Sequence, residues 1–147
     1  MRRNYFINPA LLQPIFMDPR WKDLTFVILH GGYPYTGETT YLAWKMPNVV
    51  IDFTALPTHV PTRFRSAMAE WIECVPPEKF VWGSDSNACP ESIVGIDRFS
   101  RRMIADVLER QAADGMMDEE QALRFIRLCF RENADRIFGL KDRETRV

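Results

Sequence analysis

The chain has 147 residues, a length typical of one globular domain with a single core. Hydrophobic residues make up 46% of it and charged residues 27%, which excludes a disordered protein. Lys plus Arg number 19 against 20 Asp plus Glu, so the formal net charge is -1, and the basic excess that nucleic-acid binding requires is missing.

No apolar run reaches the roughly 18 residues that a membrane-spanning helix needs, and the N-terminus lacks an apolar signal core. We therefore expect a cytoplasmic protein that binds neither membranes nor nucleic acid. Cys74, Cys89 and Cys129 are odd in number and widely separated, so neither a disulfide framework nor a zinc motif is predicted. Cys89 keeps two interpretations, a catalytic thiol or an ordinary cysteine.

Helical and strand-like segments alternate in the first part of the chain. An Asn–Pro pair opens the first helix, and continuous apolar runs mark strands that are buried on both faces, as in a parallel sheet covered by helices. In chain order, we predict a helix over 8–19, a strand over 24–29, a helix over 36–47, a strand over 48–56, a helix over 62–75 and a strand over 80–83.

The remainder of the chain is predicted to be helical. A long helix runs from Pro90 to about Ala113, Asp118 caps a second helix with Gln121 completing a capping box, and a last helix closes at Gly139. In the long helix the apolar residues recur with a helical period, at Ile93, Ile96, Phe99, Met103, Val107 and Leu108. In the next helix we expect Leu123, Ile126, Leu128 and Phe130 to face inward.

This alternation predicts βαβ units and a parallel sheet, in which ligands bind outside the carboxyl ends of the strands. His30 follows the first strand and Asp85 the third, so we expect both side chains to face one cleft. Either side chain could bind a divalent metal or act as a general base. Glycines beside them would let a ligand approach the backbone. The alternatives are a turn histidine and a helix-capping aspartate.

Three stretches carry a resemblance to a known family. They are FVILHGGYPYTGETTYLAWKMPNVVIDFTALP, VPPEKFVWGSDSNACPES and CFRENADRIFGL. They resemble the last part of amidohydrolase-related domains of the metal-dependent hydrolase superfamily, and in particular amidohydrolase-like domains that are sometimes fused to glutamine-synthetase-type domains. The likeness extends from Asn8 to Leu140.

The resemblance implies an α/β fold, a partial (β/α)8 TIM-type barrel. It would hold three parallel strands, flanking helices and a C-terminal helical segment. The three predicted strands would be the sixth, seventh and eighth of the barrel. Residues 1–140 would form the C-terminal half of an amidohydrolase-like barrel, and residues 141–147 a tail.

The resemblance also implies roles for individual residues. His30 would be a metal ligand or an electrostatic helper, and Asp85 a metal ligand and the base that takes a proton from the attacking water. The cofactor would be a divalent metal, zinc or manganese, and the substrate a small molecule. Tyr33, Ser86 and His59 are candidate substrate contacts, with ordinary loop, cap or surface positions as the alternative.

The sequence departs from the family pattern in its histidines. Family members carry a His-x-His pair on the first strand and a further metal histidine on the fifth, whereas this sequence holds only His30 and His59. Because a catalytic zinc needs about three protein ligands, we expect the others to come from another chain. A homo-oligomer or a complementary N-terminal barrel half would also cover the open edges of a three-stranded sheet.

Two functional hypotheses follow. In the first, the chain is part of a metal-dependent hydrolase that acts on a carbon–nitrogen bond or a related carboxyl substrate. In the second, it is a catalytically inactive, truncated remnant that serves as an oligomerising or binding module. A chain cut from a longer enzyme would give the same sequence.

Overall fold

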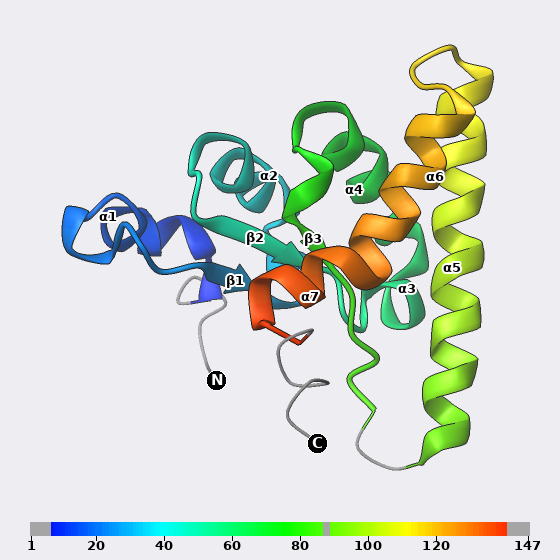
Figure 1. The fold of residues 1–147 in the computed structure, drawn as a ribbon, viewed down its shortest axis with the longest axis horizontal. Coiled ribbons are helices and arrows are strands. Elements are labelled where there is room, and N and C mark those ends of the chain that lie inside the picture. Colours follow the sequence, from blue (N-terminus) through cyan, green and yellow to red (C-terminus); the bar gives the residue numbers. More distant parts are fainter. Residues whose placement is uncertain (1–6, 87–88, 141–147) are drawn as a thin grey trace.

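A three-stranded parallel sheet forms the centre of the fold (Figure 1). The computed structural model describes residues 7–86 and 89–140. Strands β1 (Phe26–Ile28), β2 (Val49–Asp52) and β3 (Phe80–Val81) lie in the order β1-β2-β3, and both neighbouring pairs are parallel. The predicted α/β fold with three parallel strands is thereby confirmed.

The strands are shorter than the apolar runs because the backbone turns sharply at their carboxyl ends. After β1 the chain enters a 3-10 helix, Leu29–Gly32, and after β2 it enters a short helix that was not predicted, α3 (Leu56–His59). His59 is the last residue of this helix.

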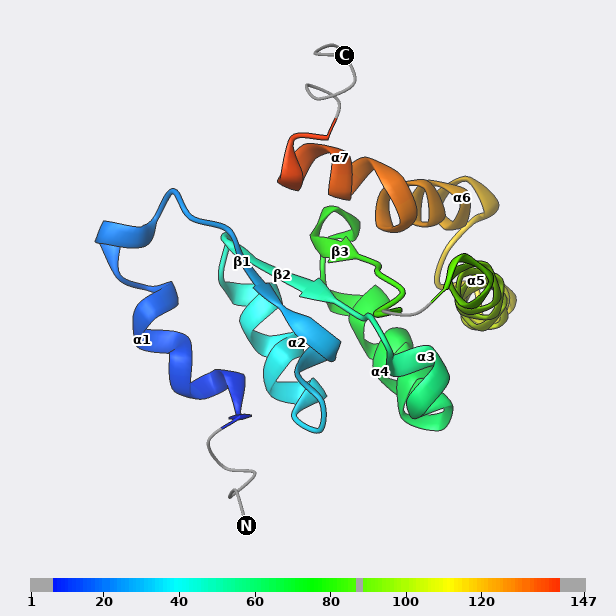
Figure 2. The ribbon, with the colours of Figure 1, turned by 90° about the horizontal axis from the view of Figure 1, so that it is seen from below.

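Two longer helices accompany the sheet, and they match the predictions closely. Helix α2 (Thr36–Lys45) packs against β2, and α4 (Pro61–Cys74) packs beside α2 (Figure 2). Leu42 and Ala43 of α2 are buried, as is Trp71 of α4. These side chains fill the space between the helices and the sheet, which is the expected arrangement for a parallel sheet in an α/β protein.

The helix predicted over 8–19 is interrupted. The structure has a 3-10 helix at Pro9–Leu12, a single helical turn α1 (Gln13–Phe16) and another 3-10 turn at Pro19–Trp21. Asn8 caps the first turn as predicted, its Oδ1 accepting from the N–H of Ala10 at 2.9 Å. Prolines cannot donate a backbone hydrogen bond, so the prolines spaced along this segment prevent one continuous helix.

Helix α5 (Pro90–Ala113) is the longest element, and its bounds agree with the prediction. Its second half is buried through residues such as Met103 and Val107. Its first half projects beyond the other described elements (Figure 1). Ile93 and Phe99 in this half are each 42% exposed. The predicted apolar period is therefore present in this helix, but it leads to burial only in the second half.

The C-terminal segment consists of α6 (Glu119–Arg127), a π-helical turn at Leu128–Glu132 and α7 (Asn133–Phe138). The predicted capping box of Asp118 and Gln121 is present. Leu123 is 49% exposed and does not face inward as predicted, because Phe125 holds the buried position on this helix. The predicted tail, residues 141–147, lies outside the described residues.

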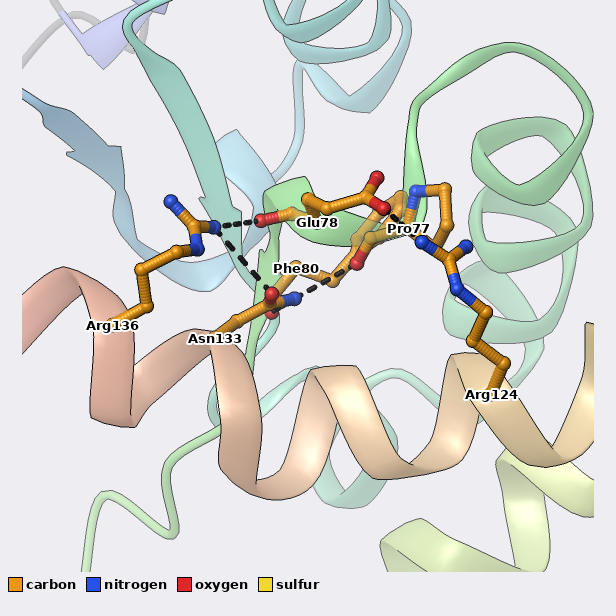
Figure 3. Close-up of polar contacts among 6 residues, drawn as sticks. All are labelled: Pro77, Glu78, Phe80, Arg124, Asn133 and Arg136. Carbon is orange, nitrogen blue, oxygen red and sulfur yellow. Dashed lines mark hydrogen bonds and ion pairs between the residues drawn. The ribbon is translucent and has the colours of Figure 1, made fainter. Parts of the chain in front are cut away.

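A polar cluster fastens this segment to the beginning of β3 (Figure 3). The buried side-chain amide of Asn133 donates to the carbonyl oxygens of Pro77 and Phe80, at 2.8 Å each. Arg136 donates to the carbonyl of Glu78 at 2.6 Å, and Arg124 pairs with the Glu78 carboxylate. The C-terminal segment therefore packs against β3.

One continuous hydrophobic core joins the sheet, the flanking helices and the C-terminal segment. Its largest fully buried side chains are those of Trp71, Phe53, Phe64 and Phe80. In the part of the chain that the structure describes, each helix is too short or too polar to traverse a lipid bilayer.

Candidate functional site

The carboxyl ends of the three strands meet at one edge of the sheet because the strands run in the same direction. His30 lies just past β1, Asp52 is the last residue of β2, and Asp85 follows β3. Two of these three residues were predicted from the sequence. Asp52 was missed, although it is the one ionisable residue in the otherwise apolar and small-polar run from 48 to 56.

Each strand is followed by a residue with an uncommon backbone conformation. Within the described residues, the non-glycine positions with positive φ are His30 (54°), Ala55 (64°) and Asp85 (54°). Such conformations cost free energy and cluster at functional sites, where surrounding contacts maintain them. The coincidence of three of them at one edge of the sheet marks this edge as the candidate site.

His30 is held by the strand next to its own. Its Nδ1 lies 3.2 Å from the carbonyl oxygen of Thr54, so Nδ1 carries the proton and donates it. The His30 side chain is exposed, and its second nitrogen, Nε2, is not used in this bond. A neutral imidazole with Nδ1 engaged in this way can offer the Nε2 lone pair to a metal.

Asp52 lies partly buried between the two predicted residues. Burial raises the pKa of its carboxyl group, and this effect is opposed by the hydrogen bond from Thr54 and by the charge of His30. The negative charge of Asp85 raises the same pKa further. The charges of His30 and Asp85 thus act on Asp52 in opposite directions, with burial as the larger cause of the raised pKa.

Gly31 and Gly83, beside the site, lie close against protein side chains. A Cβ on Gly31 would lie 2.5 Å from the Trp71 ring and 2.7 Å from Leu56. A Cβ on Gly83 would lie 2.5 Å from the Thr54 hydroxyl. The packing of these side chains therefore requires glycine at both positions, and the expectation that a ligand approaches the backbone here stays a prediction.

The predicted substrate contacts lie in three different surroundings. Tyr33 is 45% exposed and lines, together with His30, a groove of about 530 Å³ between β1 and the N-terminal segment. Ser86 shares a hydrogen bond with the hydroxyl of Ser92 at the start of α5. His59 is exposed, and its Nδ1 lies 2.9 Å from the Ala55 carbonyl. Only Tyr33 thus shares a surface hollow with His30.

A complete metal site is not formed by residues 7–86 and 89–140, where no three His, Cys, Asp or Glu side chains are arranged around one point. The nitrogen of His30 and the carboxylate of Asp85 are nevertheless the donor types that zinc and manganese accept. The residues present therefore fit part of a metal site, and further ligands are required to complete it.

The chain is similar to known proteins in sequence and in structure. A family model described as Amidohydrolase matches residues 6–140. Protein fluG of Emericella nidulans is 30% identical over 136 residues, which are 92% of this chain and 16% of fluG. A solved structure from Lactobacillus casei, assigned as a metal-dependent hydrolase, is 25% identical, with a TM-score of 0.78 over 95% of this chain and 36% of that one. The chain spans well under half the length of either protein.

Proposed function

This chain belongs to the amidohydrolase family, and we propose that it supplies part of the active site of a metal-dependent hydrolase. The observation that carries the proposal is the grouping of His30, Asp52 and Asp85 at the carboxyl ends of three parallel strands. This is the edge at which parallel α/β proteins place their catalytic residues. The solved relative assigned as a metal-dependent hydrolase supports the reaction class.

His30 and Asp85 would hold the metal, zinc or manganese. When bound, such an ion acts as a Lewis acid and lowers the pKa of a coordinated water. His30 offers Nε2, because its Nδ1 is engaged with Thr54. Asp85 offers an exposed carboxylate that can also accept the proton of the attacking water.

The substrate is a small molecule with a carbon–nitrogen bond or a related carboxyl group. Tyr33 is the best placed of the three predicted contacts, since it lines the same groove as His30. Ser86 and His59 remain predictions: Ser86 lies on the loop between β3 and α5, and His59 at the end of α3, so each would reach a substrate from another side.

The remaining ligands would come from a second polypeptide, either another copy of this chain or a complementary barrel half. Strand β1 is an edge strand in the described sheet, and its residues are only half-buried. The groove beside it is lined by apolar residues such as Leu11, Leu12 and Phe26. An added strand there would form hydrogen bonds with the unpaired backbone groups of β1 and bring new side chains to the site.

Metal titration of the purified chain tests the proposal. We expect zinc to bind weakly, with one equivalent per chain, and the dissociation constant to rise at least roughly tenfold in His30→Gln and in Asp85→Asn, as for the loss of one ligand. His59→Gln is the matched histidine control and should leave binding unchanged. Equal zinc binding by the wild type and the His30→Gln, Asp85→Asn double variant would refute the proposed site.

An inactive remnant that serves as an oligomerising or binding module is the second candidate. The observation that favours it is the missing third ligand among the described residues. Light scattering combined with the titration separates the two candidates. A stable oligomer in which neither zinc nor manganese binds through His30 would favour the inactive module.

A further inference from the structure

The turn after β2 connects Asp52 to His30 through a single residue, Thr54. The N–H of Thr54 donates to Oδ1 of Asp52 at 2.8 Å, and the carbonyl of Thr54 accepts from Nδ1 of His30 at 3.2 Å. One peptide segment is thus held from both ends, by an aspartate of its own strand and by the histidine of the neighbouring strand.

The position of Thr54 is fixed by more than these two bonds. An aspartate that accepts from the N–H two residues later forms an Asx turn, which stabilises the local backbone. Thr54 is buried, and Ala55 after it has a left-handed conformation with φ 64° and ψ −26°. Its hydroxyl lies 2.5 Å from the point where a Cβ on Gly83 would be placed, so the chain leaving β3 packs against it as well. The Thr54 carbonyl also accepts from the N–H of Leu56 at 2.8 Å, so its direction depends on the geometry of the whole turn, which begins at the Asp52 bond.

A backbone carbonyl can only accept a hydrogen bond, so the histidine nitrogen that faces it must carry the proton. The partner of one ring nitrogen decides which nitrogen keeps its lone pair. Here the bond at Nδ1 leaves the lone pair on Nε2, the nitrogen on the far side of the ring from Thr54.

We propose that Asp52 is a positioning residue that acts through Thr54 to hold His30 in the tautomer with Nδ1 protonated and Nε2 free. The role needs a hydrogen-bond acceptor at position 52 but no negative charge there. This inference rests on the proposed function in one respect: the purpose of the tautomer would be to present Nε2 to the site. The tautomer itself can be measured without any metal.

Long-range proton–nitrogen correlation spectra of the 15N-labelled chain report the tautomer directly. The chain has only two histidines, and the spectrum of His59→Gln assigns the signals of His30. Spectra are recorded without metal at about pH 8.5, where imidazoles are neutral. We expect His30 to be mainly Nδ1-protonated in the wild type and in Asp52→Asn, whose amide oxygen can still accept from Thr54.

In Asp52→Ala, the ratio of the two tautomers should shift toward Nε2–H by roughly fivefold, the equivalent of one net hydrogen bond of about 1 kcal/mol. Asp97→Ala, which removes an aspartate on α5 that pairs with Arg101, is the control and should not shift it. If Asp52→Ala does not fold, Asp52→Ser takes its place. A serine hydroxyl makes the same turn more weakly than an amide oxygen. The ratio of the Nδ1–H tautomer to the Nε2–H tautomer should therefore be lower in Asp52→Ser than in Asp52→Asn.

A wild-type His30 that is mainly Nε2-protonated would overturn the inference, as would an unchanged ratio in a folded Asp52→Ala or Asp52→Ser. Such a result would leave the proposed function standing, because His30 could still bind zinc. Conversely, His30 could show the expected tautomer while His30→Gln leaves the zinc affinity unchanged. That result would refute the proposed function and leave this inference standing.

Discussion

The side-chain amide of Asn133 lies 2.8 Å from the carbonyl oxygen of Phe80, the first residue of β3, although 53 residues separate the two along the chain (Figure 3). The same amide also donates to the carbonyl of Pro77. Asn133 is fully buried, so these carbonyls depend on it for their hydrogen bonds. The contact fastens the C-terminal segment to the strand whose other end leads to Asp85.

Replacing Asn133 should therefore destabilise the whole domain. Asn133→Ala removes the donor of two hydrogen bonds, one buried and one partly buried, and we expect the free energy of unfolding to fall by about 2–4 kcal/mol. Urea unfolding followed by tryptophan fluorescence measures the change. Arg131→Ala breaks an ion pair whose arginine side chain is 78% exposed, and this control should cost less than about 0.5 kcal/mol. Equal stabilities of the two variants would show that Asn133 has no anchoring role.

Thiol labelling gives an independent test of the same contact. Burial raises the pKa of the Cys129 thiol, which lies in the π-helical turn beside Asn133, so this thiol should react only when the C-terminal segment opens. Cys89 is exposed and should react first. We expect Asn133→Ala to accelerate labelling of Cys129, followed by mass spectrometry, while the Cys89 rate stays unchanged. Rapid labelling of Cys129 in the wild type would contradict the observed packing.

Two glycines should respond in opposite directions to the same substitution. Gly31 has φ 54° and no room for a Cβ beside Trp71, so Gly31→Ala should lower the free energy of unfolding by about 2 kcal/mol or more. Gly95 lies inside helix α5 with open space around it, so Gly95→Ala should raise stability by about 0.5–1 kcal/mol. Thermal unfolding of both variants checks the pair. A neutral Gly31→Ala would mean that the turn after β1 tolerates a side chain.

The parallel sheet could be predicted because its signals are local. Continuous apolar runs alternating with helical periodicity have few other solutions, and capping residues such as Asn8, Asp118 and Gly139 mark helix ends directly. The exposure of Ile93 and Phe99 could not be predicted in the same way. Helical periodicity indicates which side chains share a face, but burial depends on whether another element packs against that face.

The candidate site was partly predictable for a related reason. His30 and Asp85 stand out because they directly follow the ends of apolar runs. Asp52 lies inside such a run, and its role depends on a bond to Thr54 and on charges that come from two other strands. The link from Asp52 through Thr54 to His30 requires the parallel pairing of β1 and β2 to be known first.

The pH dependence of stability tests the surroundings of Asp52. Burial raises the pKa of this carboxyl group above its ordinary value of 3.8. Between 3.8 and the raised pKa, the folded state holds a proton that the unfolded state has lost, so the contribution of Asp52 to stability decreases as the pH rises through that interval. The loss then persists at neutral pH.

Asp52→Asn should remove this dependence while keeping an acceptor for the N–H of Thr54. We therefore expect the stability of the variant relative to the wild type to increase from pH 3 toward neutral pH, as measured by urea unfolding at about six pH values across that range. Asp23→Asn, at a side chain that is 88% exposed, controls for the removal of an ordinary surface carboxylate. A wild type that gains stability over Asp52→Asn as the pH rises would mean that attraction to His30 outweighs burial at Asp52. The carboxylate would then stabilise the site by its charge, and the acceptor role alone would not account for it.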